Sequence, residues 1–137
     1  MSPTPDLPPA AAARGAAPAP LVIAASLVAV EAILLSLQGI AEIVSVAGDR
    51  VALGVTTSVF FLAYGAGLAY CGWAVTRLRS WARAPIVVAQ LIQLLVAWSF
   101  RGGNTTPVAM ALALVAVLVL VGVFHPASTD ALSVDET

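Results

Sequence analysis

The sequence predicts an all-α integral membrane protein, a four-helix bundle that crosses the bilayer up, down, up and down. Four long apolar runs fill most of its 137 residues: Leu21–Val46, Val51–Val75, Ala84–Phe100 and Pro107–Phe124. A membrane-spanning helix needs about 20 apolar residues, within a range of about 17–25, and each run lies close to that range. In addition, 61% of the residues are hydrophobic and only 9% are charged. Such a chain has too few polar side chains to cover a water-soluble globule.

The runs divide the chain into three parts. Residues 1–20 are rich in proline and alanine, which favours an extended, disordered tail. Residues 21–125 form the transmembrane domain, with spans at about 21–46, 51–75, 84–100 and 107–124. Residues 126–137 begin with Pro126 and end in an acidic tail, for which we expect no fold.

Each predicted helix is separated from the next by a short polar connector. The connectors are Gly48–Arg50, Arg77–Arg83 and Arg101–Thr106. Pro85 and Pro107 stand where the third and fourth helices begin, a position that tolerates proline because the first turn leaves its N–H groups unpaired.

Arginines predict the orientation of the chain. With four spans, both termini and the middle connector lie on one side of the membrane. That side holds four arginines and the other side holds Arg50 and Arg101; the four are Arg14, Arg77, Arg79 and Arg83. Because basic loops stay inside, we expect both termini in the cytoplasm and the spans in a bacterial plasma membrane.

Polar residues in the first run lie on one helical face. Gln38 and Glu42 follow Glu31 by steps that return to within about 20° of the same direction on an α-helix. Counted from Leu21, Glu31 lies about 15 Å into the bilayer, near its centre. A carboxyl group there costs about 2.5–3.5 kcal/mol, so we expect it to face protein or a wet cavity.

Three other polar side chains reach a similar depth on the second and third runs. They are Tyr64, Gln90 and Gln93. We therefore predict an intramembrane polar core of these three residues and Glu31, with Gln38 above it. Two interpretations remain open. Either the hydrogen bonds simply join helices, at about 0.6–2 kcal/mol each, or the core is a ligand or proton site.

A second polar cluster is expected at the outer interface. Glu42 lies there near the connectors that carry Arg50 and Arg101. The sequence predicts an ion pair between Glu42 and one of these arginines, which would join the first helix to a neighbour.

Small residues in the second run are spaced for close helix packing. Gly65 and Ala69 are four residues apart, as are Ala63, Gly67 and Cys71. Such spacing lets helix backbones approach closely. The contact made is either within this bundle or between two copies of the chain, so a homodimer or a larger membrane complex is an expected assembly.

Several segments together carry a resemblance to a family. They are Leu78–Pro85, Gln90–Gln93 and Trp98–Gly103. In these segments the chain resembles small four-helix integral membrane proteins of actinobacteria. The likeness covers about residues 21–127 and implies the four-helix fold. It implies no function, because these proteins have no assigned one.

The functional expectation is a non-catalytic membrane protein, an accessory or scaffold subunit that binds another envelope protein or lipid. The sequence has no phosphate-binding loop, metalloprotease motif, nucleophile elbow or paired cysteines. We therefore expect no enzyme, no cofactor and no metal, and its net charge of −1 predicts no nucleic-acid partner. The alternative is a small oligomeric transporter or channel in which Glu31 binds a proton or cation.

Overall fold

The computed structural model describes residues 16–133, and within that range it is helical, with no strand. Four helices are long: α2 (Ala19–Val44), α3 (Val51–Thr76), α4 (Arg83–Ser99) and α5 (Thr106–Phe124). Each is long and apolar enough to cross a membrane. The all-α four-helix fold class is thus confirmed, and the helix bounds lie within a few residues of the expected spans.

Three short 3₁₀ turns reverse the chain between these helices: Gly48–Arg50, Ser80–Ala82 and Gly103–Thr105. Gly48 and Gly103 have φ angles of 65° and 60°, in the left-handed region that glycine adopts without steric cost. The predicted connectors are therefore real and tight. As a result, consecutive helices are antiparallel neighbours.

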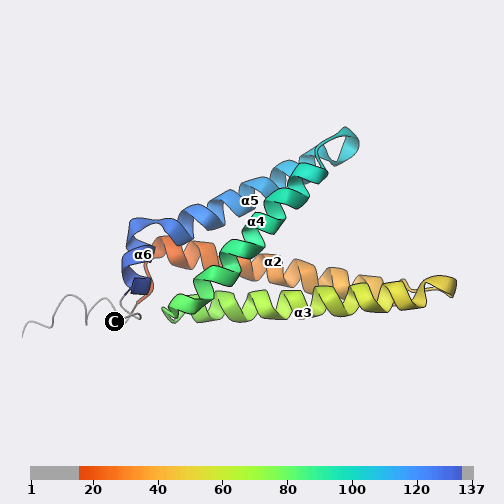
Figure 1. Ribbon diagram of the computed structural model, residues 1–137, viewed down its shortest axis with the longest axis horizontal. Coiled ribbons are helices and arrows are strands. Elements are labelled where there is room, and N and C mark those ends of the chain that lie inside the picture. The colour runs from red at the N-terminus through yellow and green to blue at the C-terminus, as the bar shows by residue number, and fades with distance from the viewer. Residues whose placement is uncertain (1–15, 134–137) are drawn as a thin grey trace, which may run out of the picture.

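The four helices form two hairpins arranged as a V (Figure 1). In the first hairpin α2 packs on α3, and in the second α4 packs on α5. The hairpins meet at the end of the molecule that carries the Ser80–Ala82 turn, which we call the closed end. They diverge toward the turns Gly48–Arg50 and Gly103–Thr105, which form the open end.

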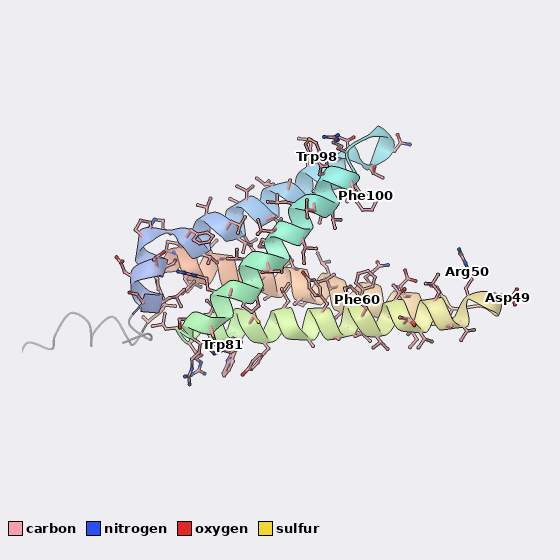
Figure 2. The ribbon with its side chains drawn as sticks, in the orientation of Figure 1. Asp49, Arg50, Phe60, Trp81, Trp98 and Phe100 are labelled. Atoms are coloured by element: carbon pink, nitrogen blue, oxygen red, sulfur yellow. The ribbon has the colours of Figure 1, made fainter. Side chains whose placement is uncertain are left out.

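Aromatic and charged side chains mark both ends of the V. Trp81 lies at the closed end, whereas Trp98 and Phe100 lie at the tip of the second hairpin (Figure 2). Asp49 and Arg50 lie at the tip of the first hairpin. This distribution matches the aromatic levels expected at two membrane interfaces.

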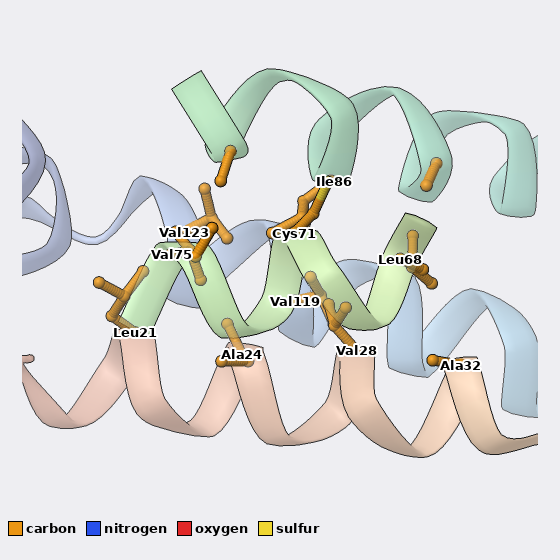
Figure 3. Close-up of a cluster of buried hydrophobic side chains, with 14 of the residues drawn as sticks. Leu21, Ala24, Val28, Ala32, Leu68, Cys71, Val75, Ile86, Val119 and Val123 are labelled. Carbon is orange, nitrogen blue, oxygen red and sulfur yellow. The ribbon is translucent and has the colours of Figure 1, made fainter. Parts of the chain in front are cut away.

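The apolar core fills the closed half of the molecule (Figure 3). It contains side chains from all four long helices, among them Val28, Val75, Ile86 and Val119, each fully buried. In the open half, by contrast, Gly39 of α2 faces α3, where a Cβ at residue 39 would lie 3.1 Å from the Ser58 carbonyl oxygen. Packing in that half of the first hairpin thus joins α2 to α3.

Large apolar side chains also cover much of the outer surface. Leu95, Met110, Ile33 and Val59 are each more than half exposed. Soluble proteins rarely expose contiguous apolar surface on this scale, whereas hydrocarbon tails solvate it well. The chain is a multi-pass membrane protein with a lipid bilayer as its surroundings.

The segment after α5 differs from expectation. Instead of lacking a fold from residue 126 onward, the chain forms a short helix, α6 (Pro126–Ser133), at the closed end. Leu132 is only 1% exposed, and the Ser128 hydroxyl donates a hydrogen bond of 2.6 Å to the Gly122 carbonyl oxygen. One apolar anchor and one buried hydroxyl thus dock a segment whose average composition is polar. The tail expected over residues 1–20 and the end of the acidic tail fall largely outside the described residues.

Candidate functional site

Glu31 and Gln90 form the centre of the polar site. Glu31 lies on α2 and is 8% exposed, and Gln90 on α4 is fully buried. The Gln90 amide Nε2 donates a hydrogen bond of 2.8 Å to Glu31 Oε2. The structure thus brings together two of the residues that the sequence placed in one polar core, and this contact joins the two hairpins.

Each of these side chains also has one oxygen that is buried without a hydrogen-bond partner. These atoms are Glu31 Oε1 and Gln90 Oε1. An ionised carboxylate and an amide oxygen are both acceptors, so the two oxygens cannot satisfy each other. Leaving a buried polar atom unpaired costs about 1–3 kcal/mol. With Glu31 ionised, the site therefore lacks at least one hydrogen-bond donor.

Gln93 joins two helices of one hairpin. Its Nε2 donates a hydrogen bond of 2.9 Å to the Leu112 carbonyl oxygen of α5. The Gln93 amide thus joins α4 to α5 by a hydrogen bond. This agrees with the first interpretation of the polar core, in which its hydrogen bonds simply join helices.

Tyr64 and Gln38 stand on the other side of the site. The Tyr64 ring is stacked on Phe60, with 5.8 Å between the ring centroids and 8° between their planes. Gln38 is exposed and its Nε2 donates a hydrogen bond of 3.1 Å to Glu42 Oε1. Both side chains lie near Glu31, but neither is hydrogen-bonded to it among the described contacts.

These side chains line a groove of about 350 Å³ between the hairpins, which we call the inter-hairpin groove. Its walls come from all four long helices and are almost entirely apolar. The lining residues are Glu31, Leu34, Leu35, Gln38, Phe60, Phe61, Tyr64, Leu68, Ile92, Gln93, Val96 and Leu112. The polar core is therefore not sealed, because Glu31 lies beside a space large enough for a small molecule.

The expected outer-interface ion pair does not form. Glu42 accepts its hydrogen bond from Gln38, and the Arg101 guanidinium lies 3.3 Å from the centroid of the Trp98 ring. Neither Arg50 nor Arg101 makes an ion pair with Glu42 in residues 16–133. For Arg101 the reason lies in the V, since its neighbour Trp98 stands at the tip of the second hairpin and Glu42 lies on α2 of the first (Figure 2). The V does not account for Arg50, which belongs to the same hairpin as Glu42.

The arginines proposed to set the topology gather near the closed end. Arg77 lies over the Trp73 ring at 5.2 Å and Arg83 over the Phe124 ring at 5.7 Å, both measured to the ring centroid. Arg79 precedes the Ser80–Ala82 turn and is exposed. Three positive charges thus lie where α3 meets α4.

The two small-residue patterns of α3 face different surroundings. A Cβ at Gly65 would lie 2.8 Å from Ser36 Oγ and 3.0 Å from the Ala32 carbonyl oxygen, so Gly65 permits close approach of α2. A Cβ at Gly67 would meet nothing within 4 Å. Gly67 and Cys71 instead line a shallow depression between α3 and α4. Of the two glycines only Gly65 permits close helix approach, whereas Ala69 of its pattern is exposed and Cys71 of the other pattern belongs to the apolar core.

Sequence reasoning missed the aromatic wall of the groove. Phe60 and Phe61 of α3 line it together with Tyr64. Phe60 and Tyr64 are four residues apart and so share a helical face, which is the signal that could have identified them. Membrane helices carry many apolar residues at that spacing, and the pattern alone does not distinguish a ligand wall from a lipid-facing surface.

Within residues 16–133 no three potential ligands among histidine, cysteine, aspartate and glutamate come together. Comparison of the chain with family models, with curated proteins and with solved structures gave no match.

Proposed function

We propose that this protein is a non-catalytic membrane protein that binds a partner from within the bilayer, between its two hairpins. In this role it is an accessory or scaffold subunit for another envelope protein or for lipid. The observation that carries the proposal is the inter-hairpin groove with Glu31 in its wall. A bundle closed along its whole length would leave no such space.

The chemistry of the groove supports binding over catalysis. Gln90 and Gln93 are engaged in hydrogen bonds between helices. A general acid–base mechanism needs a titratable side chain within hydrogen-bond reach of the proton that it transfers. Glu31 is the one carboxylate in the wall of the groove, and Tyr64, the other titratable side chain there, is not hydrogen-bonded to it among the described contacts. We therefore propose a binding site and no enzyme.

We further propose that the protein lies in a bacterial plasma membrane with both termini in the cytoplasm. The exposed positive charge of Arg79, next to Arg77 and Arg83, supports this orientation. Single cysteines placed at Arg79 and at Asn104, in a Cys71→Ser background, test it with a membrane-impermeant thiol reagent on intact cells. We expect labelling at residue 104 only, and labelling at residue 79 only would reverse the orientation.

Site-specific photo-crosslinking tests the binding role. A benzophenone amino acid at Val96 lies in the groove, and the same residue at Val117 of α5 serves as the control. Both valines are exposed to a similar degree, 40% and 47%. We expect a discrete adduct in native membranes from position 96 that is absent from position 117. Identical adduct patterns from both positions would contradict the proposal.

A transporter remains the second candidate, and the unpaired Glu31 Oε1 is the observation that favours it. A carboxylate beside an open groove is a suitable group for binding a proton or a cation. Flux into proteoliposomes, measured for the wild type and Glu31→Gln, separates the two functions. Flux that is lost in the variant would favour transport, whereas no flux from correctly folded wild type leaves the binding role.

A further inference from the structure

The Glu31 carboxylate makes a specific chemical demand on any occupant of the inter-hairpin groove. Glu31 is more than nine-tenths buried, its Oε2 is engaged by Gln90, and its Oε1 has no partner. Oε1 is itself closed off from solvent, but the terminal torsion of a glutamate is broad, so a turn of the carboxylate brings an oxygen toward the groove that Glu31 lines. One oxygen can thus stay bound to Gln90 while the other accepts a hydrogen bond from the groove.

The walls of the groove determine which chemical groups suit the rest of the occupant. Phe60, Phe61 and Tyr64 present aromatic surface from α3, and Leu35 and Ile92 present aliphatic surface from α2 and α4. Aromatic faces attract cations as well as apolar groups, more strongly when the cation is desolvated. A positively charged head attached to an apolar body therefore matches both the carboxylate and the walls.

A bare metal ion fits the groove poorly. Hard cations such as Ca²⁺ take six to eight oxygen ligands, and the groove offers one carboxylate among mainly apolar side chains. A protonated amine needs fewer partners, because it has at most three N–H donors and the aromatic faces of the groove can contact those that Glu31 does not accept. The volume of about 350 Å³ lies at the small end of ligand pockets.

We propose that the inter-hairpin groove binds an amphiphilic amine, with the protonated nitrogen paired to Glu31 and the apolar body held against the aromatic wall. This inference rests on the proposed binding function and names the chemical class of the partner. The amine reaches the groove from the bilayer, in which its apolar body is soluble. It supplies the donor that Glu31 Oε1 lacks.

Calorimetric titration of the protein in nanodiscs of zwitterionic lipid tests this proposal at neutral pH. The probes are 1-naphthylmethylamine and its neutral analogue 1-naphthylmethanol, and empty nanodiscs provide the background from partitioning. We expect wild type to bind the amine more tightly than the alcohol by about tenfold or more, as a hydrogen bond to a buried charge requires.

Two matched variants test whether the charge of Glu31 causes the preference for the amine over the alcohol. Glu31→Gln keeps the shape of the side chain but removes the charge, so we expect the amine and the alcohol to bind equally. Glu42→Gln makes the same change on the same helix at a residue outside the groove, and we expect it to keep the wild-type preference. An unchanged preference in Glu31→Gln, or no saturable binding to wild type, would overturn the proposal.

A variant that fills the groove covers the case in which Glu31→Gln does not fold. Val96→Trp leaves the carboxylate in place and occupies the space, so we expect weaker binding of both probes. Equal binding to this variant and to wild type would place the amine elsewhere and reject the site. A discrete photo-adduct at position 96 without saturable amine binding would reject the amine alone and leave the proposed function standing.

Discussion

The Glu31–Gln90 contact is a single hydrogen bond between two side chains that each leave an oxygen unpaired. Removing one partner of the pair therefore has a different free-energy cost from removing both. Removing one partner leaves the other buried with no compensation, whereas removing both replaces the pair with apolar contact. In a membrane, where alternatives to the lost partner are few, this asymmetry decides how variants at the two positions behave.

We predict that Gln90→Leu lowers the free energy of unfolding by about 1–2 kcal/mol, because the Glu31 carboxylate loses its donor. The double variant Glu31→Leu/Gln90→Leu should recover most of that loss. Thermal unfolding in detergent measures both. A double variant less stable than Gln90→Leu would show that the pair stabilises the fold more than apolar contact does.

Two glycines of α3 offer a second test at the residue scale. We predict that Gly65→Ala is less stable than Gly67→Ala by about 1–3 kcal/mol, because only the Cβ at residue 65 meets the backbone of α2. Both changes bring the same gain in helix propensity, so the difference isolates the close approach. Equal thermal stabilities for the two variants would contradict the close packing of α2 and α3.

Helix α6 shows how one anchor positions an element. It has eight residues, too few to be stable alone in water, and it depends on Leu132 and Ser128 for docking. We predict that Leu132→Ala, a change that costs about 2–5 kcal/mol in a packed core, undocks α6. Amide hydrogen exchange over residues 126–133 should then accelerate, while the exposed Asp130→Ala leaves it unchanged. Equal protection in both variants would show that α6 docks without Leu132.

Local pattern predicts the elements of this protein but not how its hairpins meet. Each long helix follows from the length and polarity of one apolar run, and each connector from its charges, with glycines in the first and third. The Glu31–Gln90 contact followed from depth, because both residues lie near the middle of their helices. The pairing of Glu42 with Arg101 failed because it required the hairpin tips to meet. The angle between the hairpins is set by side-chain volumes spread over four helices, and no short pattern encodes that angle.

At the scale of the whole molecule, the V divides the protein into a packed half and an open half. The core of the closed half fixes the hairpins relative to one another, and the groove lies beside the Glu31–Gln90 contact. Lipid or a partner must fill the space between the diverging helices, because an empty space of that size would lose the contacts of its lining. The open half is thus the part of the molecule suited to binding.

The distance between the two hairpin tips in a bilayer tests this account most directly. Spin labels on cysteines at Asp49 and Asn104, in a Cys71→Ser background, report that distance by pulsed electron paramagnetic resonance. Labels at Arg79 and Ser133 provide the reference for the closed end. The account predicts a longer distance between the tips than between the reference labels. A tip-to-tip distance as short as the reference would mean that the hairpins close along their whole length and that the groove does not exist in the membrane.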